Sequence, residues 1–135
     1  MREPLEVVRL AYEAFSYGDW KTAQSMVDPK VEWSLLRHRP DVDPYAEGVG
    51  PTGLLSFWAS VFRKYRVRPR AYVPRGDHVV VPLDLHGRGG QGAEHLEEVW
   101  SVRVTGGKIR SVHEFATVEE ALEAADSSVD PRRAR

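Results

Sequence analysis

The chain of 135 residues contains no cysteine. This absence excludes a disulfide framework, a cysteine-ligated zinc site and a thiolate nucleophile. No apolar run approaches the ~18 residues that a membrane-spanning helix needs, and the first residues lack the pattern of a signal peptide. The formal net charge is only −1, so no overall field favours nucleic acid or a membrane. We expect a cytoplasmic protein.

The composition is that of a globular protein, because 41% of the residues are hydrophobic and 29% are charged. A chain of this length can bury one core. No internal repeat or second domain is visible. Residues 126–135 are polar and basic, which indicates a frayed tail after a single domain over residues 5–125.

Two helices are predicted at the start of the chain. Asp19 is a typical N-cap for the second, short helix, and Asp28–Pro29 is expected to end that helix. The first helix is expected to end at Tyr17. Apolar residues recur along it at helical spacing: Leu5, Val8, Tyr12 and Phe15.

A strand over residues 31–36 and a loop over residues 37–51 are expected to follow. A loop of this length is either mobile or functional. Thr52 is expected to cap a third helix, whose wide apolar stripe carries Trp58 and Phe62.

The second half of the chain has the period of two that is typical of strands. Gly106–Gly107 can take the positive φ values of a tight hairpin turn, and Thr117–Glu120 is a capping box that opens a last helix. Helices segregated from an antiparallel sheet predict an α+β fold. A curved sheet around a long helix would enclose a cone-shaped cavity. The strands are expected over residues 66–73, 78–86, 94–104 and 108–116.

Two conspicuous patterns have ordinary explanations. Gly87–Gly92 matches G-x-G-x-x-G, but a dinucleotide site needs a helix directly after the last glycine, and a strand is predicted there. A flexible hairpin loop therefore explains this motif. The basic run from Arg63 to Arg75 alternates as a solvated strand face, on which Tyr72 is the only aromatic residue, whereas a nucleic-acid site carries several exposed aromatic residues. We expect no nucleic-acid partner.

One polar group has the composition of a metal site. If His86 and His95 pair across their hairpin, Asp84 and Glu97 form the next pair on the same face. Two imidazoles and two carboxylates are able to hold a divalent ion. Ion pairs are commoner than metal sites, however, and this face is opposite the apolar one. A polar or salt-bridged interface is therefore expected there, with no metal and no cofactor.

Glu98 shares a strand face with Trp100 and is expected to point toward the apolar interior. Burial without a cation raises the pKa of a carboxyl group, which makes it a general base near neutral pH. The alternative is a structural role, in which Glu98 pairs with Arg103, with Arg110 or with a helix end.

The facing of the last strand depends on the turn that precedes it. A two-residue Gly106–Gly107 loop pairs Trp100 with His113 across the hairpin. A three-residue loop that starts one residue earlier pairs Glu98 with Glu114, and two such close carboxylates share a proton. Both faces of this strand mix polar and apolar residues, so periodicity leaves the choice open.

Short motifs occur along the chain in a characteristic order: Phe15–Trp20, Val31–Trp33, Gly53–Trp58, Val99–Val102, Gly107–Ile109 and His113–Ala124. Together they resemble the SnoaL-like branch of the nuclear transport factor 2-like (NTF2-like) superfamily, over about residues 5–125. The resemblance implies a cone-like α+β barrel, in which a curved antiparallel sheet wraps around the N-terminal helices. It also implies a homodimer through the outer face of the sheet.

The resemblance favours the register in which Glu114 points inward. Polyketide cyclases of this superfamily carry an inward acidic residue at the matching position and use it in acid–base work. Glu114 is then the expected acid/base, Glu98 the group that tunes it, and His113 the alternative. The fold alone leaves the function open, since the superfamily also includes non-enzymatic binding domains.

Three roles known from the ketosteroid isomerases are missing. Their general base falls on Trp33, and their two oxyanion-hole residues fall on Ala11 and Trp100, so steroid isomerisation by that mechanism is not expected. The indoles instead indicate a pocket for a flat, apolar ligand. The residues expected to bind it are Trp33, Trp58, Trp100, Phe62, Phe15, Tyr12, Leu83 and Leu85.

Two hypotheses follow. In the first, the protein binds a small apolar molecule, aromatic or polycyclic, with or without isomerase, cyclase or hydrolase chemistry at Glu114 and Glu98. In the second, the tryptophans fill the cone and the protein is a non-catalytic dimeric module. The second predicts that charge reversal at Asp84 or Glu97 weakens the dimer.

Overall fold

The computed structural model describes residues 2–34, 47–87 and 95–129. These ranges hold four helices: α1 (Pro4–Ser16), α2 (Trp20–Ser25), α3 (Pro51–Lys64) and α4 (Val118–Val129). They also hold seven strands: β1 (Val27–Ser34), β2 (Glu47–Val49), β3 (Tyr65–Pro69), β4 (Val73–Arg75), β5 (His78–Gly87), β6 (His95–Thr105) and β7 (Lys108–Phe115). None of these helices is long and apolar enough to cross a membrane.

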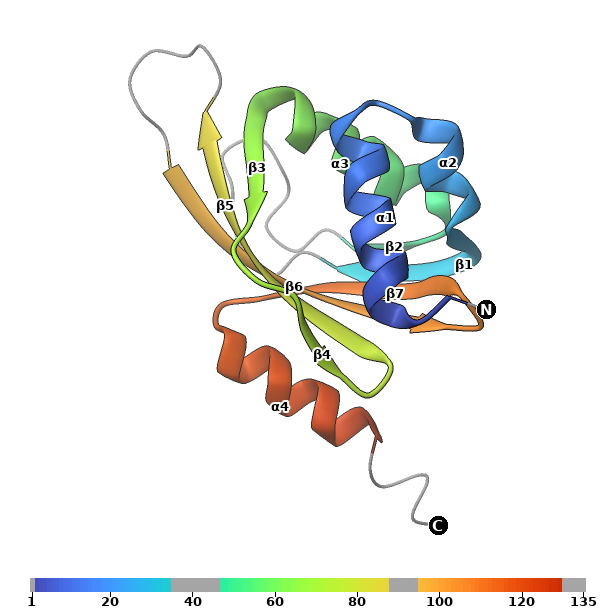
Figure 1. Ribbon diagram of the computed structural model, residues 1–135, viewed down its shortest axis with the longest axis vertical. Coiled ribbons are helices and arrows are strands. Elements are labelled where there is room, and N and C mark those ends of the chain that lie inside the picture. The colour runs from blue at the N-terminus through green and yellow to red at the C-terminus, as the bar shows by residue number, and fades with distance from the viewer. Residues whose placement is uncertain (1, 35–46, 88–94, 130–135) are drawn as a thin grey trace.

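The described strands form one curved sheet (Figure 1). Its order is β2-β1-β7-β6-β5-β3, and β4 pairs with the part of β5 that β3 leaves uncovered. Every pair is antiparallel, as expected, except β1 and β7, which are parallel. The sheet stays open among the described strands, with β2 at one edge and β3 and β4 at the other. The α+β class is confirmed.

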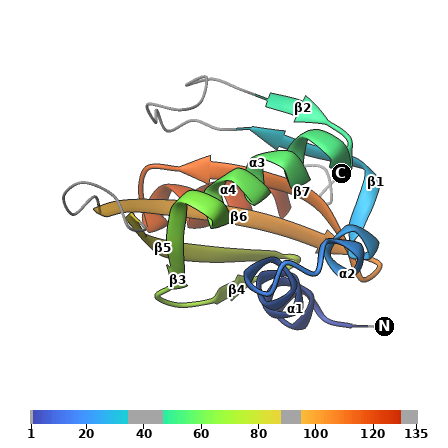
Figure 2. The same ribbon diagram turned by 90° about the horizontal axis from the view of Figure 1, so that it is seen from above.

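Different helices cover the two faces of the sheet (Figures 1 and 2). Because side chains alternate along a strand, Val79 and Val81 of β5 join the main core with α1 and α3. Val80, between them, packs with Ala121 of α4 in a separate small core. The first three helices therefore lie on the concave face, and α4 lies on the convex face.

Local signals set several helix ends as predicted. Asp19 caps α2, since its carboxylate accepts a hydrogen bond from the Thr22 amide at 3.2 Å. Thr117 caps α4 in the same way, with its hydroxyl oxygen 3.1 Å from the Glu120 amide nitrogen. The first helix ends one residue before the predicted Tyr17.

Two expectations about helix and strand limits are wrong. Asp28–Pro29 does not separate a helix from a strand but lies inside β1, where the pairing with β7 shifts register. A proline is tolerated at such an irregularity because no ladder bond needs its missing N–H group. The third helix begins at Pro51 rather than after a Thr52 cap, since Gly50 makes the preceding turn with a φ of 103°.

Two predicted loops contain or adjoin strands. Residues 47–49, expected in a loop, pair with β1 as strand β2. The remainder of that loop up to residue 46 lies outside the described residues, as do residues 88–94, which hold most of the G-x-G-x-x-G motif. A strand, β6, follows that motif. The strand predicted over 66–73 is interrupted at residues 70–72, which separate β3 from β4.

The β6–β7 hairpin combines a tight turn with a bulge. Gly106–Gly107 form a two-residue turn with φ values of 61° and 75°. The register then shifts by one residue, because Arg110 is an extra residue on β7. Beyond this bulge, Trp100 lies opposite Glu114. Neither predicted pairing is therefore correct.

Candidate functional site

A cavity of about 80 Å³ lies between α1, α3 and the concave face of the sheet. Glu98 is the only carboxylate among its described lining residues. Every side chain expected to bind a ligand lines this cavity, except Trp33, which is absent from the lining and lies near Phe57 instead. The lining residues are Val8, Ala11, Tyr12, Phe15, Trp58, Val61, Phe62, Val67, Pro69, Tyr72, Val81, Leu83, Leu85, Glu98, Trp100, Val102 and Ile109.

Aromatic rings form one wall of the cavity. Phe15 meets Trp58 edge to face, with ring centroids 4.5 Å apart, and stacks on Phe62 at 5.7 Å. Trp58 also lies 6.1 Å from Trp100. These separations are within the range of favourable aromatic contacts. The rings pack on one another and keep the cavity small.

Glu98 is only 1% exposed. The Trp100 indole Nε1 donates a hydrogen bond to Glu98 Oε1 at 3.0 Å, which orients the carboxylate from the same strand face. The two arginines considered as its partners are engaged elsewhere. Arg103 contacts Asp77, and Arg110 contacts Asp28.

Glu114 is fully buried on the same concave face, with an exposed fraction of 0%. It lies directly opposite Trp100 and therefore diagonal to Glu98, two residues away along β6. It is not among the residues that line the cavity. The bulge at Arg110 turns Glu114 inward, so the expected facing is correct although the expected register is not.

His113 lies on the opposite, convex face of β7, next to β1. Its Nδ1 is 2.7 Å from the Ser34 hydroxyl oxygen. Burial lowers the pKa of His113, and the nearby Glu32 carboxylate opposes this shift. The sheet therefore separates His113 from the cavity and from both buried carboxylates.

The two tyrosines of the lining lie near β3. The Tyr12 hydroxyl donates to the Val67 carbonyl oxygen at 2.7 Å, and burial raises the pKa of Tyr12. Burial also raises the pKa of Tyr72, whose ring lies under the Arg9 guanidinium at 5.2 Å. Sequence alternation assigned Tyr72 to the solvated face. The break in the strand at residues 70–72 ends that alternation and lets this ring reach the cavity.

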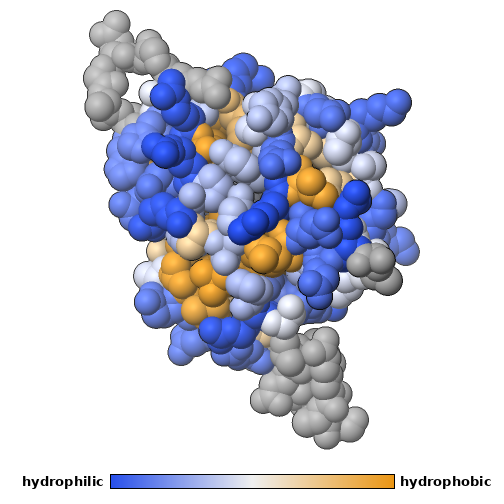
Figure 3. All heavy atoms as spheres, viewed as in Figure 1, coloured by the Kyte–Doolittle hydropathy of each residue, from blue (hydrophilic) through white to orange (hydrophobic). Residues whose placement is uncertain are grey.

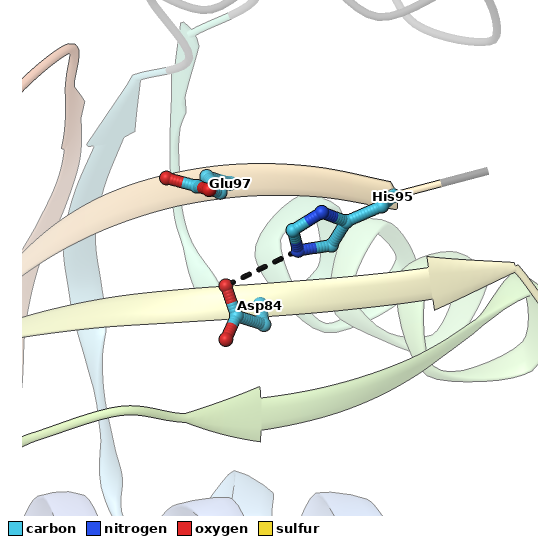
Figure 4. A group of neighbouring side chains, drawn as sticks. All are labelled: Asp84, His95 and Glu97. Atoms are coloured by element: carbon cyan, nitrogen blue, oxygen red, sulfur yellow. Dashed lines mark hydrogen bonds and ion pairs between the residues drawn. The ribbon is translucent and has the colours of Figure 1, made fainter.

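The polar group on the convex face forms as predicted. Strand pairing joins His86 to His95 and Asp84 to Glu97. Ligand atoms of Asp84, His95 and Glu97 all lie within 4.8 Å of one another (Figure 4). Among the described residues, this group is the one whose donors are close enough to share a metal ion.

Comparison with known proteins identifies a family and a fold. The model of the SnoaL-like domain matches residues 8–112. No curated protein sequence matches the chain.

Several solved structures are similar. Bal32a, from a soil-derived mobile gene cassette, has a TM-score of 0.71 at 16% identity, over 83% of this chain and 87% of that one. An NTF2-like protein from Burkholderia xenovorans LB400 has a TM-score of 0.68 at 17% identity, over 90% and 94% of the two chains. A proposed polyketide cyclase from Pseudomonas putida KT2440 has a TM-score of 0.63 at 19% identity, over 91% and 98%.

Proposed function

The chain belongs to the SnoaL-like family of NTF2-like proteins, and we propose from this that it binds a small apolar molecule in the cavity beneath its curved sheet. One observation carries the proposal. A buried carboxylate, Glu98, lines an otherwise largely apolar cavity and is oriented by the Trp100 indole. An apolar site with a single well-oriented polar group is typical of small-molecule pockets.

The size of the cavity limits the ligand. At about 80 Å³, it is roughly half the volume of an engineered cavity of about 150 Å³ that binds benzene. A single ring therefore requires a modest opening, and a polycyclic molecule requires the Trp58 and Phe62 rings to move apart. A carboxylate favours a hydrogen-bond donor. A small phenol is the simplest molecule with both properties.

Glu98, rather than Glu114, is the carboxylate that contacts the ligand in this proposal, because Glu98 lines the cavity. If the bound molecule reacts, Glu98 exchanges the proton with it. Glu114, on the same face one strand away, acts on Glu98 as a positioning group. Such acid–base work fits isomerisation, cyclisation or hydrolysis, and the similarity to a proposed polyketide cyclase agrees with this class.

Phenol and benzene test the proposal as probes. Phenol should raise the thermal midpoint of the wild-type protein increasingly as its concentration rises, and benzene should raise it less. Glu98→Gln should abolish this preference for phenol while the circular dichroism spectrum stays unchanged. Ala11→Leu fills the cavity and should remove both responses. Val80→Leu, the same kind of enlargement in the small core under α4, is the matched control and should keep both.

The second candidate is the non-catalytic dimeric module in which the tryptophans fill the cone, and the small cavity volume favours it. It predicts that neither probe shifts the thermal midpoint of the wild-type protein. It also predicts that Ala11→Leu raises the midpoint by filling an empty space. The absence of any shift with either probe in the correctly folded wild-type protein rejects the ligand-binding proposal.

A further inference from the structure

The convex face of the β5–β6 hairpin carries a second polar constellation, away from the cavity. Asp84 and Glu97 are cross-strand partners, and His95 lies one pair further along the same face. Figure 4 shows the Asp84 carboxylate of β5 directed toward the His95 ring of β6, with Glu97 beside them on the same strand as His95. We propose that Asp84, His95 and Glu97 bind a divalent transition-metal ion, and that Zn²⁺ fits this donor set.

The distances support a shared ligand position. His95 Nε2 lies 3.3 Å from Asp84 Oδ1. Zinc binds nitrogen and oxygen ligands at about 2.0–2.2 Å in a tetrahedron, which sets neighbouring ligand atoms about 3.4 Å apart. The imidazole and the first carboxylate already have this spacing. Glu97 lies within 4.8 Å of both and, with a side chain that is 60% exposed, is able to rotate inward.

A positively charged side chain, that of Arg70, already lies at the edge of this group. The Arg70 guanidinium lies 3.5 Å from Asp84 Oδ1 and 3.9 Å from Glu97 Oε1. Exposed ion pairs of this kind contribute little to stability, and the Arg70 side chain is 47% exposed. The displacement of Arg70 by a divalent ion therefore costs little free energy. Arg70 competes with the metal for the same two carboxylates.

The imidazole distinguishes this group from a simple ion pair. Histidine nitrogen with carboxylate oxygen selects zinc and its neighbours over Ca²⁺ and Mg²⁺, which prefer oxygen ligands alone. The His86 ring stacks on His95 with centroids 4.5 Å apart and an angle of 12°. This contact places the two rings face to face. Leu83 and Leu85, which flank Asp84 on the strand, line the cavity from the other face, so a bound ion would stiffen that wall.

Calorimetric titration of the full chain with Zn²⁺ tests the proposal. We expect one ion per chain, and no comparable heat with Mg²⁺. Asp84→Asn and His95→Gln should each weaken binding by about tenfold or more, since even outer-shell changes reach that size. Arg70→Gln should strengthen binding, because it removes the competing cation.

Two matched variants separate this site from adventitious binding. Arg75→Gln removes the same charge from an ion pair with Asp126 elsewhere on the surface and should leave the affinity for Zn²⁺ unchanged. His86→Gln removes the stacked imidazole and should weaken binding much less than His95→Gln. No loss of affinity in Asp84→Asn, or equal losses in the two histidine variants, would overturn the assignment. Circular dichroism checks that each variant is folded.

Discussion

At the scale of single residues, the sheet sorts the ionisable side chains into two environments. Glu98 and Glu114 are enclosed by the concave core. His113 and His78 lie on the convex side, where burial lowers the pKa of each imidazole and neighbouring carboxylates oppose the shift. The buried acids and the shifted histidines therefore do not form one catalytic group. In the proposed acid–base reaction, the proton is exchanged by Glu98, which lines the cavity, and not by either histidine.

The shifted pKa of His113 makes stability depend on pH. In the folded chain the pKa of His113 lies below the ordinary value of 6.5. At a pH near or below 6.5 the unfolded chain therefore binds more protons than the folded chain does. The free energy of unfolding should then fall as the pH drops from about 7.5 to about 5. In His113→Gln this fall should be smaller, as measured by urea unfolding across the range. His86→Gln, at an exposed site, is the control, and an equal flattening there would contradict the assignment.

At the scale of elements, close contacts between neighbouring helices and strands decide which local preference prevails. Gly53 lies in the first turn of α3, where alanine has the higher helix propensity. A Cβ atom on Gly53 would come within 2.9 Å of Trp33 Cζ2. The glycine is therefore a packing requirement between α3 and β1.

This contact predicts that Gly53→Ala raises or lowers the stability of the protein depending on whether Trp33 is present. Gly53→Ala should destabilise the wild-type protein, because overpacking costs about 1–3 kcal/mol and the gain in helix propensity is at most about 1 kcal/mol. In a Trp33→Leu background the same substitution should be neutral or stabilising. Urea unfolding of the four proteins in this cycle measures the difference. Stabilisation of the wild-type chain by Gly53→Ala would show that the indole moves away freely.

At the scale of the whole molecule, the convex face is divided. The small core under α4 covers one part of it, and the charged group around Asp84 and Glu97 lies on another part of the same face. In Figure 3, hydrophobic side chains gather in separate patches among hydrophilic ones, so the coloured part of that view has no single continuous apolar surface. A homodimer through the part of the convex face around Asp84 and Glu97 would depend on polar contacts of mixed sign, and a two-fold axis brings such a patch onto itself.

This homodimer is a proposal with its own test. Asp84→Lys or Glu97→Lys should weaken the dimer by about tenfold or more, because each places like charges next to Arg70 and its copy. Sedimentation equilibrium measures the dissociation constant. Glu6→Lys, on α1 at the opposite side of the sheet, is the control and should leave it unchanged. A wild-type chain that stays monomeric at high concentration would reject the dimer.

The sequence by itself determined the features that depend on near neighbours along the chain. The order of the helices and of the longer strands, the Asp19 cap, the Gly106–Gly107 turn and the shared face of Glu98 and Trp100 follow from periodicity, capping and turn chemistry. The pairing of Asp84 with Glu97 also followed, because one hairpin register fixes every pair within it.

Only the tertiary structure decided which way the last strand faces and how large the cavity is. Arg110 adds one residue to β7, held by Thr105 on β6 and Asp28 on β1. Because strand facing has a period of two, that single residue turns Glu114 inward and His113 outward. The cavity volume depends on how rings from α1, α3 and β6 pack together, and such distant contacts leave no local pattern in the sequence.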